Sequence, residues 1–379
     1  MTSADGRLRV LFSVYPFPGH LFPLVSTAWA LRSAGHEVLL AGFQGPFDAI
    51  SKAGLPVAEV VDFDTIAGLH RQYTDPEAEG AADADPNPIT GLLSAWSDAM
   101  ADGTVDLAKR WQPDLVVHDV AQGAGPLAAS VLSVPAVEHR GGFHAGAAEV
   151  VPAMAAKLAP AYQRHGVNGR PERRAVIDVV PPSMAGACDE GIWPVRYVPY
   201  GSGGLVPDWL IGPAQRPRVA VTLGTTAPEM LGIGVFSALV DAAGGTNADF
   251  VFALGGADPA PLGKLPSNVR VCDWVPLHVL LESCAAIVHQ GGIGTTLSAL
   301  HAGLPQLALP TGDDNFINAE ALVKRGVGLS AAPSEVNGAL FARLLGDRTL
   351  TVAADEVRKE MAATDSPAQA VERLVRLAR

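Results

Sequence analysis

The chain alternates short apolar strands with helices, and this alternation begins twice. The first series opens with a strand over Arg9–Val14, a helix over Pro23–Ala34 and a strand over Glu37–Ala41. The second opens with a strand over Arg218–Leu223, after a segment rich in proline and glycine, Tyr197–Pro217. Repeated strand–helix–strand units predict parallel sheets joined by right-handed crossovers. The sequence therefore predicts an α/β fold with two Rossmann-like domains.

Further elements continue each series. Strands are expected at Pro56–Val61, Asp114–His118, Ala136–His139, Asp249–Ala253, Val269–Val271, Ala285–His289 and Gln306–Leu309, and helices at Leu92–Trp111, Gly125–Leu132, Val151–His165, Leu231–Ala243, Leu277–Ser283, Gly294–Ala302, Asn315–Arg325 and Ser334–Leu345, with two more from Leu350 to Arg379. The acidic stretch Thr74–Pro88 is expected to be a surface loop.

Composition restricts the partners. The formal net charge of the 379 residues is −12, which argues against a general surface for nucleic acid or an anionic membrane. The three cysteines, Cys188, Cys272 and Cys284, show neither a disulfide framework nor zinc-ligand spacing. Neither a signal-peptide core nor an apolar run of about 18 residues is visible, so we expect a cytoplasmic protein.

One loop in the second series has the features of an anion site. An apolar strand ends at His289, and Gly291, Gly292 and Gly294 then lead into a helix with Thr295 in its first turn. The unpaired N–H groups at a helix N-terminus bind phosphate readily, and glycines allow it to approach closely. A tight strand–helix turn without a ligand is the alternative. The Gly-x-Gly-x-x-Gly fingerprint of a dehydrogenase is not matched.

Several motifs together resemble those of family 1 glycosyltransferases, and in particular the bacterial branch that decorates antibiotics with TDP-deoxysugars, such as the calicheamicin, macrolide and aromatic-polyketide enzymes. They are Gly19-His20-x-x-Pro23, Arg196–Tyr200, Pro207–Trp209, Leu223–Thr226, His289–Thr295, Ala302–Gln306 and Pro310–Ala319. The resemblance implies a GT-B fold, in which two Rossmann-like domains with parallel sheets face a cleft. Residues 1–205 would bind the acceptor and residues 218–362 the nucleotide sugar. Residues 206–217 would link them, and a helix within 363–379 would pack back on the first domain.

The resemblance also implies donor-binding residues. His289 would hold the diphosphate together with the glycines and Thr295, and Thr225 is a second phosphate contact or an ordinary turn threonine. Trp274 would stack on the nucleobase while the Val275 backbone bonds its edge; the alternative is a core tryptophan. Asp314 and Asn315 correspond to an Asp-Gln pair that holds sugar hydroxyls. They also suit the start of a helix.

The acceptor side contains the expected catalytic residues. His20, in the loop after the first strand, matches the general base of the family, and Asp119, at the end of another strand, would orient it. A surface or capping histidine is the alternative for His20. His118 should point to the other face of the strand, and His144 is a candidate acceptor contact.

These features predict an inverting glycosyltransferase that transfers a TDP-sugar to a polyketide or similar aglycone, without metal or cofactor. A homodimer is a further expectation. C-glycosylation of an aromatic polyketide, a nucleotide-sugar epimerase on the same fold and a catalytically silent partner of another transferase remain as alternatives. The Thr74–Pro88 loop could form a lid over the acceptor.

Overall fold

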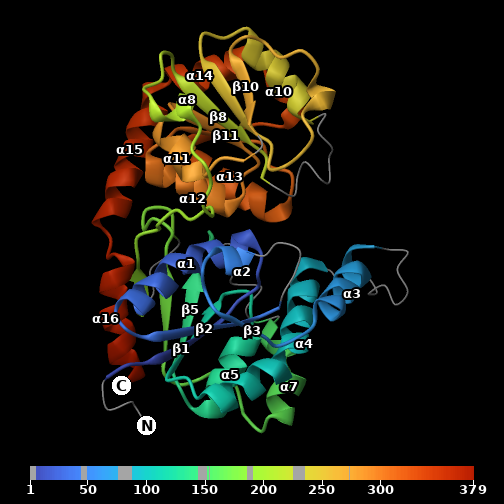
Figure 1. Ribbon diagram of the computed structural model, residues 1–379, viewed down its shortest axis with the longest axis vertical. Helices are drawn as coiled ribbons and strands as arrows, with labels where there is room; N and C mark the ends of the chain where they lie inside the picture. The colour runs from blue at the N-terminus through green and yellow to red at the C-terminus, as the bar shows by residue number, and fades with distance from the viewer. Residues whose placement is uncertain are drawn as a thin grey trace. The chain divides into compact units, whose positions relative to one another are not determined.

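The computed structural model describes residues 6–43, 49–75, 88–143, 152, 154–185, 191–224, 235–272 and 274–379. The chain divides into two compact units. Unit 1 comprises Met1–Val179, Ala187–Val195 and Asp365–Arg379, and unit 2 comprises Val180–Gly186 and Arg196–Thr364. Each unit contains one parallel sheet covered by helices (Figure 1).

The sheet of unit 1 has seven parallel strands in the order β3-β2-β1-β4-β5-β6-β7. The strands are β1 (Arg9–Ser13), β2 (Glu37–Gly42), β3 (Val57–Glu59), β4 (Leu115–Asp119), β5 (Ala136–Arg140), β6 (Arg174–Asp178) and β7 (Ile192–Pro194). The order reverses between β1 and β4. In an open parallel sheet, ligands bind beyond the carboxyl ends of the strands at such a switch point.

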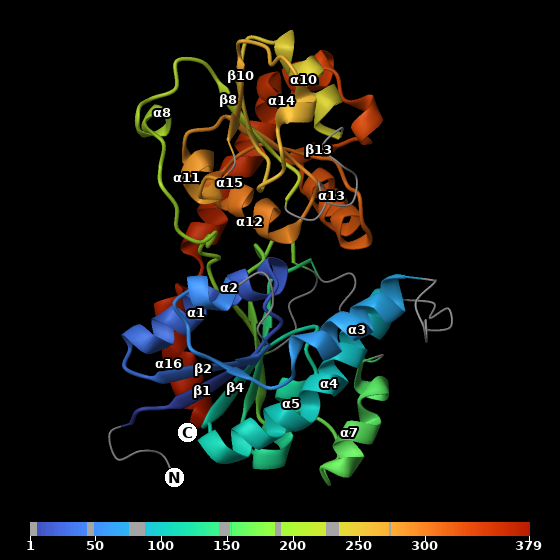
Figure 2. The ribbon, with the colours of Figure 1, turned by 45° about the vertical axis from the view of Figure 1, so that its right-hand side comes forward.

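Helices cover both faces of this sheet. They are α1 (Pro18–Ser33), α2 (Ala49–Lys52), α3 (Phe63–Thr74), α4 (Pro88–Trp111), α5 (Ala124–Leu132), α7 (Ala159–Arg164) and α16 (Pro367–Ala378). Helices α1 and α16 lie side by side on one face, and α4 and α5 lie on the other (Figures 1 and 2).

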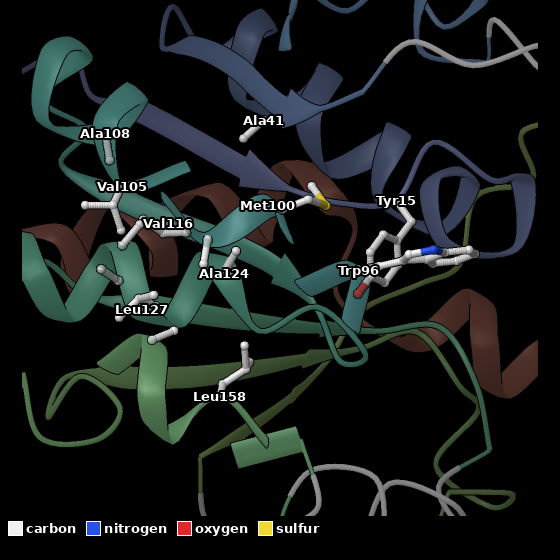
Figure 3. Close-up of a cluster of buried hydrophobic side chains, with 14 of the residues drawn as sticks. Tyr15, Ala41, Trp96, Met100, Val105, Ala108, Val116, Ala124, Leu127 and Leu158 are labelled. Carbon is white, nitrogen blue, oxygen red and sulfur yellow. The ribbon is translucent and has the colours of Figure 1, made fainter. Parts of the chain in front are cut away.

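The main core of unit 1 lies between the sheet and helices α4 and α5. Figure 3 shows Met100 and Val105 of α4, Val116 of β4 and Leu127 of α5 in this cluster. All four side chains are buried. Their burial fixes the two helices on the sheet, and so fixes the ends of β1 and β4.

Unit 2 has a six-stranded parallel sheet in the order β10-β9-β8-β11-β12-β13. Its strands are β8 (Arg218–Thr222), β9 (Asp249–Ala253), β10 (Val269–Cys272), β11 (Ala286–His289), β12 (Gln306–Ala308) and β13 (Gly328–Ser330). Its helices are α8 (Asp208–Ile211), α10 (Val235–Gly244), α11 (Leu277–Glu282), α12 (Ile293–Ala302), α13 (Asp313–Arg325), α14 (Gly338–Gly346) and α15 (Arg348–Ala363), with 3₁₀ turns at Ala260–Leu262 and Pro333–Glu335. The switch point lies between β8 and β11. Two doubly wound parallel sheets confirm the predicted fold class.

The divisions of the chain differ from the expected ones. Unit 2 begins at Arg196 rather than at residue 218, and it also includes Val180–Gly186. Ser183 explains the second point, because its N–H and hydroxyl groups donate to the two carboxylate oxygens of Glu360 in α15, at 2.6 Å each.

Helix α16 belongs to unit 1 although α15 belongs to unit 2. The helices are separated at Asp365, which forms a parallel bridge with Val195 and an ion pair of 2.6 Å with Arg373. Ser366 caps α16, and its hydroxyl accepts the N–H of Gln369. Apolar residues of α16 are buried against the rest of unit 1.

Candidate functional site

His20 lies in the first turn of α1, which begins at Pro18. The expectation that it belongs to a loop, with the helix starting at Pro23, is wrong. Pro18 is accepted in the first turn, and Pro23 lies inside the helix. The helical start holds the imidazole in a defined position, because the carbonyl of Phe17 accepts the N–H groups of His20 (3.0 Å) and Leu21 (2.9 Å).

The sheet brings His20 and Asp119 together, as the sequence predicted. Nδ1 of His20 is hydrogen-bonded to Oδ2 of Asp119 at the end of β4. The His20 side chain is 32% exposed, whereas that of Asp119 is 6% exposed. A partly accessible imidazole is therefore backed by a buried carboxylate.

Asp119 is held in its charged form. Burial raises its pKa, but the charge and hydrogen bond of His20 and the N–H of Ala121, 3.0 Å from Oδ1, together bring the pKa below its usual value. A carboxylate only accepts hydrogen bonds, so Nδ1 of His20 carries a proton, and in the neutral ring Nε2 bears the lone pair. This is the tautomer that a general base requires.

A second polar contact fixes α1 on the sheet. Nε2 of His139, on β5, lies 3.0 Å from the hydroxyl of Thr27. His139 is paired with Asp119 in the sheet register, and Thr27 lies about two turns after His20 on the same side of α1. Burial lowers the pKa of His139 to about 4, so the ring is neutral at neutral pH.

Tyr15 packs edge-on against the His20 ring, with the centroids 5.4 Å apart. Its hydroxyl donates to the carbonyl of Leu93 (2.7 Å) and contacts the hydroxyl of Ser97 (2.7 Å), which accepts the N–H of Gly123 (2.9 Å). Figure 3 shows Tyr15 beside Trp96. Burial raises the pKa of Tyr15, so the phenol stays protonated. The sequence analysis did not identify Tyr15 or Ser97 as part of the surroundings of His20. The only signal in the sequence is that Tyr15 follows closely after the first strand.

His118 faces the other side of β4, as predicted. It lies beneath α5, where a Cβ on Gly125 would be 2.9 Å from that of His118. Its Nδ1 donates to the carbonyl of Asp119 at 2.9 Å. His118 is therefore not part of the histidine–carboxylate pair.

In unit 2, the loop after β11 presents a helix N-terminus. Gly291 has a φ of +90°, and Gly292 is the N-cap of α12. The first N–H groups of this helix belong to Ile293, Gly294 and Thr295, and such groups have no partner within a helix. The side-chain amide of Asn318 donates to the carbonyl of Gly291 at 2.7 Å, which holds the loop on α13.

His289 does not offer the donor that the sequence led us to expect. Its side chain is fully buried, Nδ1 accepts the N–H of Gly291 (3.0 Å), and Nε2 donates to Oε1 of Gln306 (2.8 Å). Both ring nitrogens are engaged within the protein, and burial lowers the pKa of His289 to about 4. The imidazole shapes the loop instead of reaching out of it.

The other donor-side residues lie around this sheet edge in different ways. Trp274 is 50% exposed, so it is not a core tryptophan, while Val275 is buried. The N-terminus of α13 adjoins the loop, since a Cβ on Gly291 would be 2.8 Å from the carbonyl oxygen of Asn315. Asp314 is exposed. The helix starts at Asp313 after Gly312, which corrects the expectation that these polar side chains cap it.

Thr225, His144 and most of the Thr74–Pro88 loop lie outside the described residues. Within the described ranges, no group of three or more His, Cys, Asp or Glu side chains is arranged to hold a metal ion. Among the helices described, none is long and apolar enough to cross a membrane.

Two doubly wound parallel sheets in one chain are also found in solved glycosyltransferase structures. The structure of the glycosyltransferase SnogD from Streptomyces nogalater superimposes with a TM-score of 0.87 and 37% identity, over 98% of this chain and 100% of that one. SsfS6 of Streptomyces sp. SF2575, solved with thymidine diphosphate, gives a TM-score of 0.81 at 30% identity, over 98% and 100% of the respective chains. The fold is that of the GT-B glycosyltransferases.

Sequence comparison gives the family. Residues 29–224 match the N-terminal domain, and residues 237–377 the C-terminal domain, of the family described as erythromycin biosynthesis protein CIII-like. The chain belongs to this family and is a glycosyltransferase. It is 38% identical to the elloramycin glycosyltransferase ElmGT of Streptomyces olivaceus over 97% of each chain, and 36% identical to the L-demethylnoviosyl transferase of Streptomyces niveus over 85% of each.

Proposed function

We propose that the enzyme transfers a deoxysugar, with inversion at the anomeric carbon, from a thymidine diphosphate (TDP) sugar to a polyketide or other natural-product aglycone. Named relatives support the substrate classes: one is a TDP-daunosamine transferase, and another acts on 10-deoxymethynolide. The observation that carries the proposal is the partly exposed His20 paired with the buried Asp119.

In the proposed reaction, Nε2 of His20 takes the proton of an acceptor hydroxyl as its oxygen attacks the anomeric carbon. The new glycosidic bond forms while the bond to the diphosphate breaks on the opposite side, so the configuration inverts. Asp119 stabilises the imidazolium ion that results and keeps Nδ1 protonated. Its buried negative charge and its hydrogen bond to the ring suit it for this task.

The donor would bind to unit 2. The N–H groups of Gly294 and Thr295 at the start of α12 would donate to the departing diphosphate as negative charge develops on it. Gly291 and Gly292 would let the phosphates approach closely. His289 would act indirectly, because its Nδ1 atom accepts the N–H of Gly291 and so holds the loop in place. The exposed ring of Trp274 offers a face for the thymine base, with Val275 beside it.

Asp314 and Asn315, in the first turn of α13, would hold the sugar hydroxyls next to Gly291. Thr225 remains a proposed phosphate contact and His144 a proposed acceptor contact.

Since helix and loop N–H groups can stabilise the leaving diphosphate, we propose that transfer needs neither metal nor cofactor. Activity should then survive treatment with EDTA. A homodimer remains a prediction, testable by light scattering.

The test of the catalytic pair uses purified variants, a panel of aglycones and mass spectrometry of the products formed from TDP-sugars. A positioned general base contributes about 10²–10⁴-fold, so His20→Ala should lower kcat by this factor. Asp119→Asn should lower it less, because the imidazole remains. Both variants should still bind TDP, because the proposed donor residues belong to the other unit.

His165→Ala is the matched control. His165 also pairs with an aspartate of unit 1, Asp102, at 2.7 Å, but neither residue contacts the His20–Asp119 pair in a hydrogen bond. This variant should keep the parental kcat. Full activity of His20→Ala with an aliphatic alcohol acceptor would exclude His20 as the base. Conversion of the TDP-sugar without any acceptor would instead indicate an epimerase.

A further inference from the structure

Tyr15 contacts both members of the histidine–carboxylate pair, one directly and one through the backbone. Its ring packs edge-on against the ring of His20, with the centroids 5.4 Å apart and the planes at 85°. Its hydroxyl oxygen lies 3.2 Å from the carbonyl oxygen of Ala121. The N–H of the same Ala121 donates to Oδ1 of Asp119 at 3.0 Å. One side chain therefore connects the imidazole to the turn that holds the carboxylate.

The hydroxyl of Tyr15 is buried, yet it has polar partners on two elements. Its single proton faces the carbonyl oxygens of Leu93 on α4, at 2.7 Å, and of Ala121, at 3.2 Å. The hydroxyl of Ser97, also on α4, lies 2.7 Å away and accepts the N–H of Gly123 at 2.9 Å. The proton of Ser97 is thus left for the Tyr15 oxygen. Tyr15 joins the end of β1, helix α4 and the loop after β4.

The ring of Tyr15 is fixed as well as its hydroxyl. Trp96 of α4 packs edge-on against it, with the centroids 5.6 Å apart (Figure 3). Phe17 in turn stacks on Trp96 at a centroid distance of 5.3 Å. Tyr15 and Trp96 are both buried. In close packing, a ring with such neighbours and a bonded hydroxyl keeps one position, so it can restrict the motion of a group beside it.

Given the proposed function, in which His20 is the general base, we propose that Tyr15 is a positioning residue that keeps the imidazole of His20 aligned with the carboxylate of Asp119. A hydrogen bond by itself allows an imidazole to turn about the bond, whereas an edge-on ring beside it restricts that turning. The partners of the Tyr15 hydroxyl hold Ala121, and with it the carboxylate. Such placement matters because a shift of about 1 Å can cost on the order of 100-fold in rate.

The experiment removes only the hydroxyl group. Tyr15→Phe keeps the ring beside His20 but gives up the contacts with the Ala121 carbonyl and the α4 groups. The kcat with an aliphatic alcohol acceptor, measured from initial rates of product formation, should fall by about 10–100-fold. The dissociation constant of TDP should stay that of the parent, because the proposed donor residues belong to unit 2. Tyr162→Phe is the matched control: this partly buried tyrosine lies on α7 of the same unit, and the variant should keep the parental kcat.

The pH profile of kcat distinguishes positioning from a general loss of structure. The rate should rise with pH as His20 loses its proton. A weaker contact with Asp119 lowers the pKa of His20, so in Tyr15→Phe this rise should move to lower pH by about half a unit or more. Burial lowers the pKa values of His118 and His139, the other histidines near Asp119, and keeps Tyr15 protonated in the parent. A misfolded fraction would lower kcat without shifting the profile.

Two further variants keep the test decisive. In the His20→Ala background, Tyr15→Phe should have no further effect on kcat, because the group that it positions is gone. Ser97→Ala leaves Tyr15 in place but removes its partner on α4. It should lower kcat and shift the pH profile in the same direction, and it decides the test if Tyr15→Phe does not fold.

The outcomes separate the role of Tyr15 from the proposed function. Full activity of His20→Ala would remove the proposed base, and the role of Tyr15 with it. If His20→Ala is impaired while Tyr15→Phe and Ser97→Ala keep the parental kcat and pH profile, only the role of Tyr15 fails. A further loss of kcat on adding Tyr15→Phe to His20→Ala would also overturn it, because Tyr15 would then act independently of the base.

Discussion

At the scale of single residues, histidines that look alike in the sequence occupy different environments. His20 is partly exposed and paired with a carboxylate, whereas His118, His139 and His289 are buried. Burial lowers the pKa of each of these three, to about 4 for His139 and His289. The buried rings are therefore neutral hydrogen-bonding groups, and their protonation opposes folding.

We predict that unit 1 loses stability on acidification, in part through His139. Its folded pKa of about 4 lies below the unfolded value of about 6.5, so between these pH values the unfolded chain binds a proton that the folded chain does not. The contribution of neutral His139 to the free energy of unfolding is complete well above pH 6.5 and falls as the pH drops. Between about pH 7 and pH 5 the loss should be on the order of 2 kcal/mol.

Urea unfolding of the parent and of His139→Gln at these two pH values measures this loss. The variant should be less stable than the parent at neutral pH, because the Thr27 contact changes, but its stability should depend less on pH. The same pH dependence in both proteins would show that His139 is protonated in the folded state.

The sequence indicated three parts of the proposed site, namely His20, Asp119 and the Gly291–Gly292 loop. It did so through the family resemblance, and because the carboxyl ends of parallel strands lie at one edge of a sheet. It could not show that both nitrogens of His289 are occupied, since this depends on Gln306 in the next strand.

At the scale of elements, close packing of helix α4 against the segment after β3 depends on Gly103. A Cβ at this position would lie 2.0 Å from the carbonyl oxygen of Val60, a backbone atom that cannot move aside alone. Gly103→Ala should therefore destabilise unit 1 by about 3 kcal/mol or more, as overpacking does in its severe cases.

Gly68→Ala is the control for this prediction. Gly68 lies in helix α3, and a Cβ there would have no atom within 4 Å. Alanine in an open helix position should stabilise by about 0.5–1 kcal/mol. Thermal unfolding followed by circular dichroism compares the two variants; equal melting temperatures would contradict the role of the Gly103 contact.

Most strands were predicted because each is a short apolar run between helices. The helices and strands that the sequence did not reveal are β6, β7, β13, α3 and the short helix α8, which lies in the segment expected to be a linker. Strands β7 and β13 have only three residues each, too few for a periodic pattern. Helix α3 has one buried residue, Ile66, and its clearest signal is the Asp62 cap, whose carboxylate accepts the N–H of Thr65 at 2.8 Å.

At the scale of the whole molecule, the chain passes between the two units four times, after Val179, Gly186, Val195 and Thr364. The last passage returns α16 to unit 1, where Val371 and Leu374 are buried. Ending the chain after Thr364 should thus weaken unit 1 alone. Burial of these two side chains corresponds to about 3–6 kcal/mol, a large part of a domain's stability of about 5–15 kcal/mol.

Calorimetry should then show a lower melting temperature for unit 1, while the shortened chain still binds TDP through unit 2. Arg376→Ala is the control, because Arg376 and Glu372 are exposed and 3.9 Å apart, and such pairs contribute little. Loss of TDP binding in the shortened chain, with the thermal transition of unit 1 unchanged, would show that α16 supports unit 2 instead.

The route of the chain also limits how halves of related enzymes can be recombined. A chimera joined once, near Arg196, would combine the N-terminal unit of one parent with the α16 of the other, and the foreign helix would have to fit the surface of α1. Hybrids that exchange acceptor and donor preferences should be obtained more often when α16, from Asp365 onward, is taken from the same parent as residues 1–195.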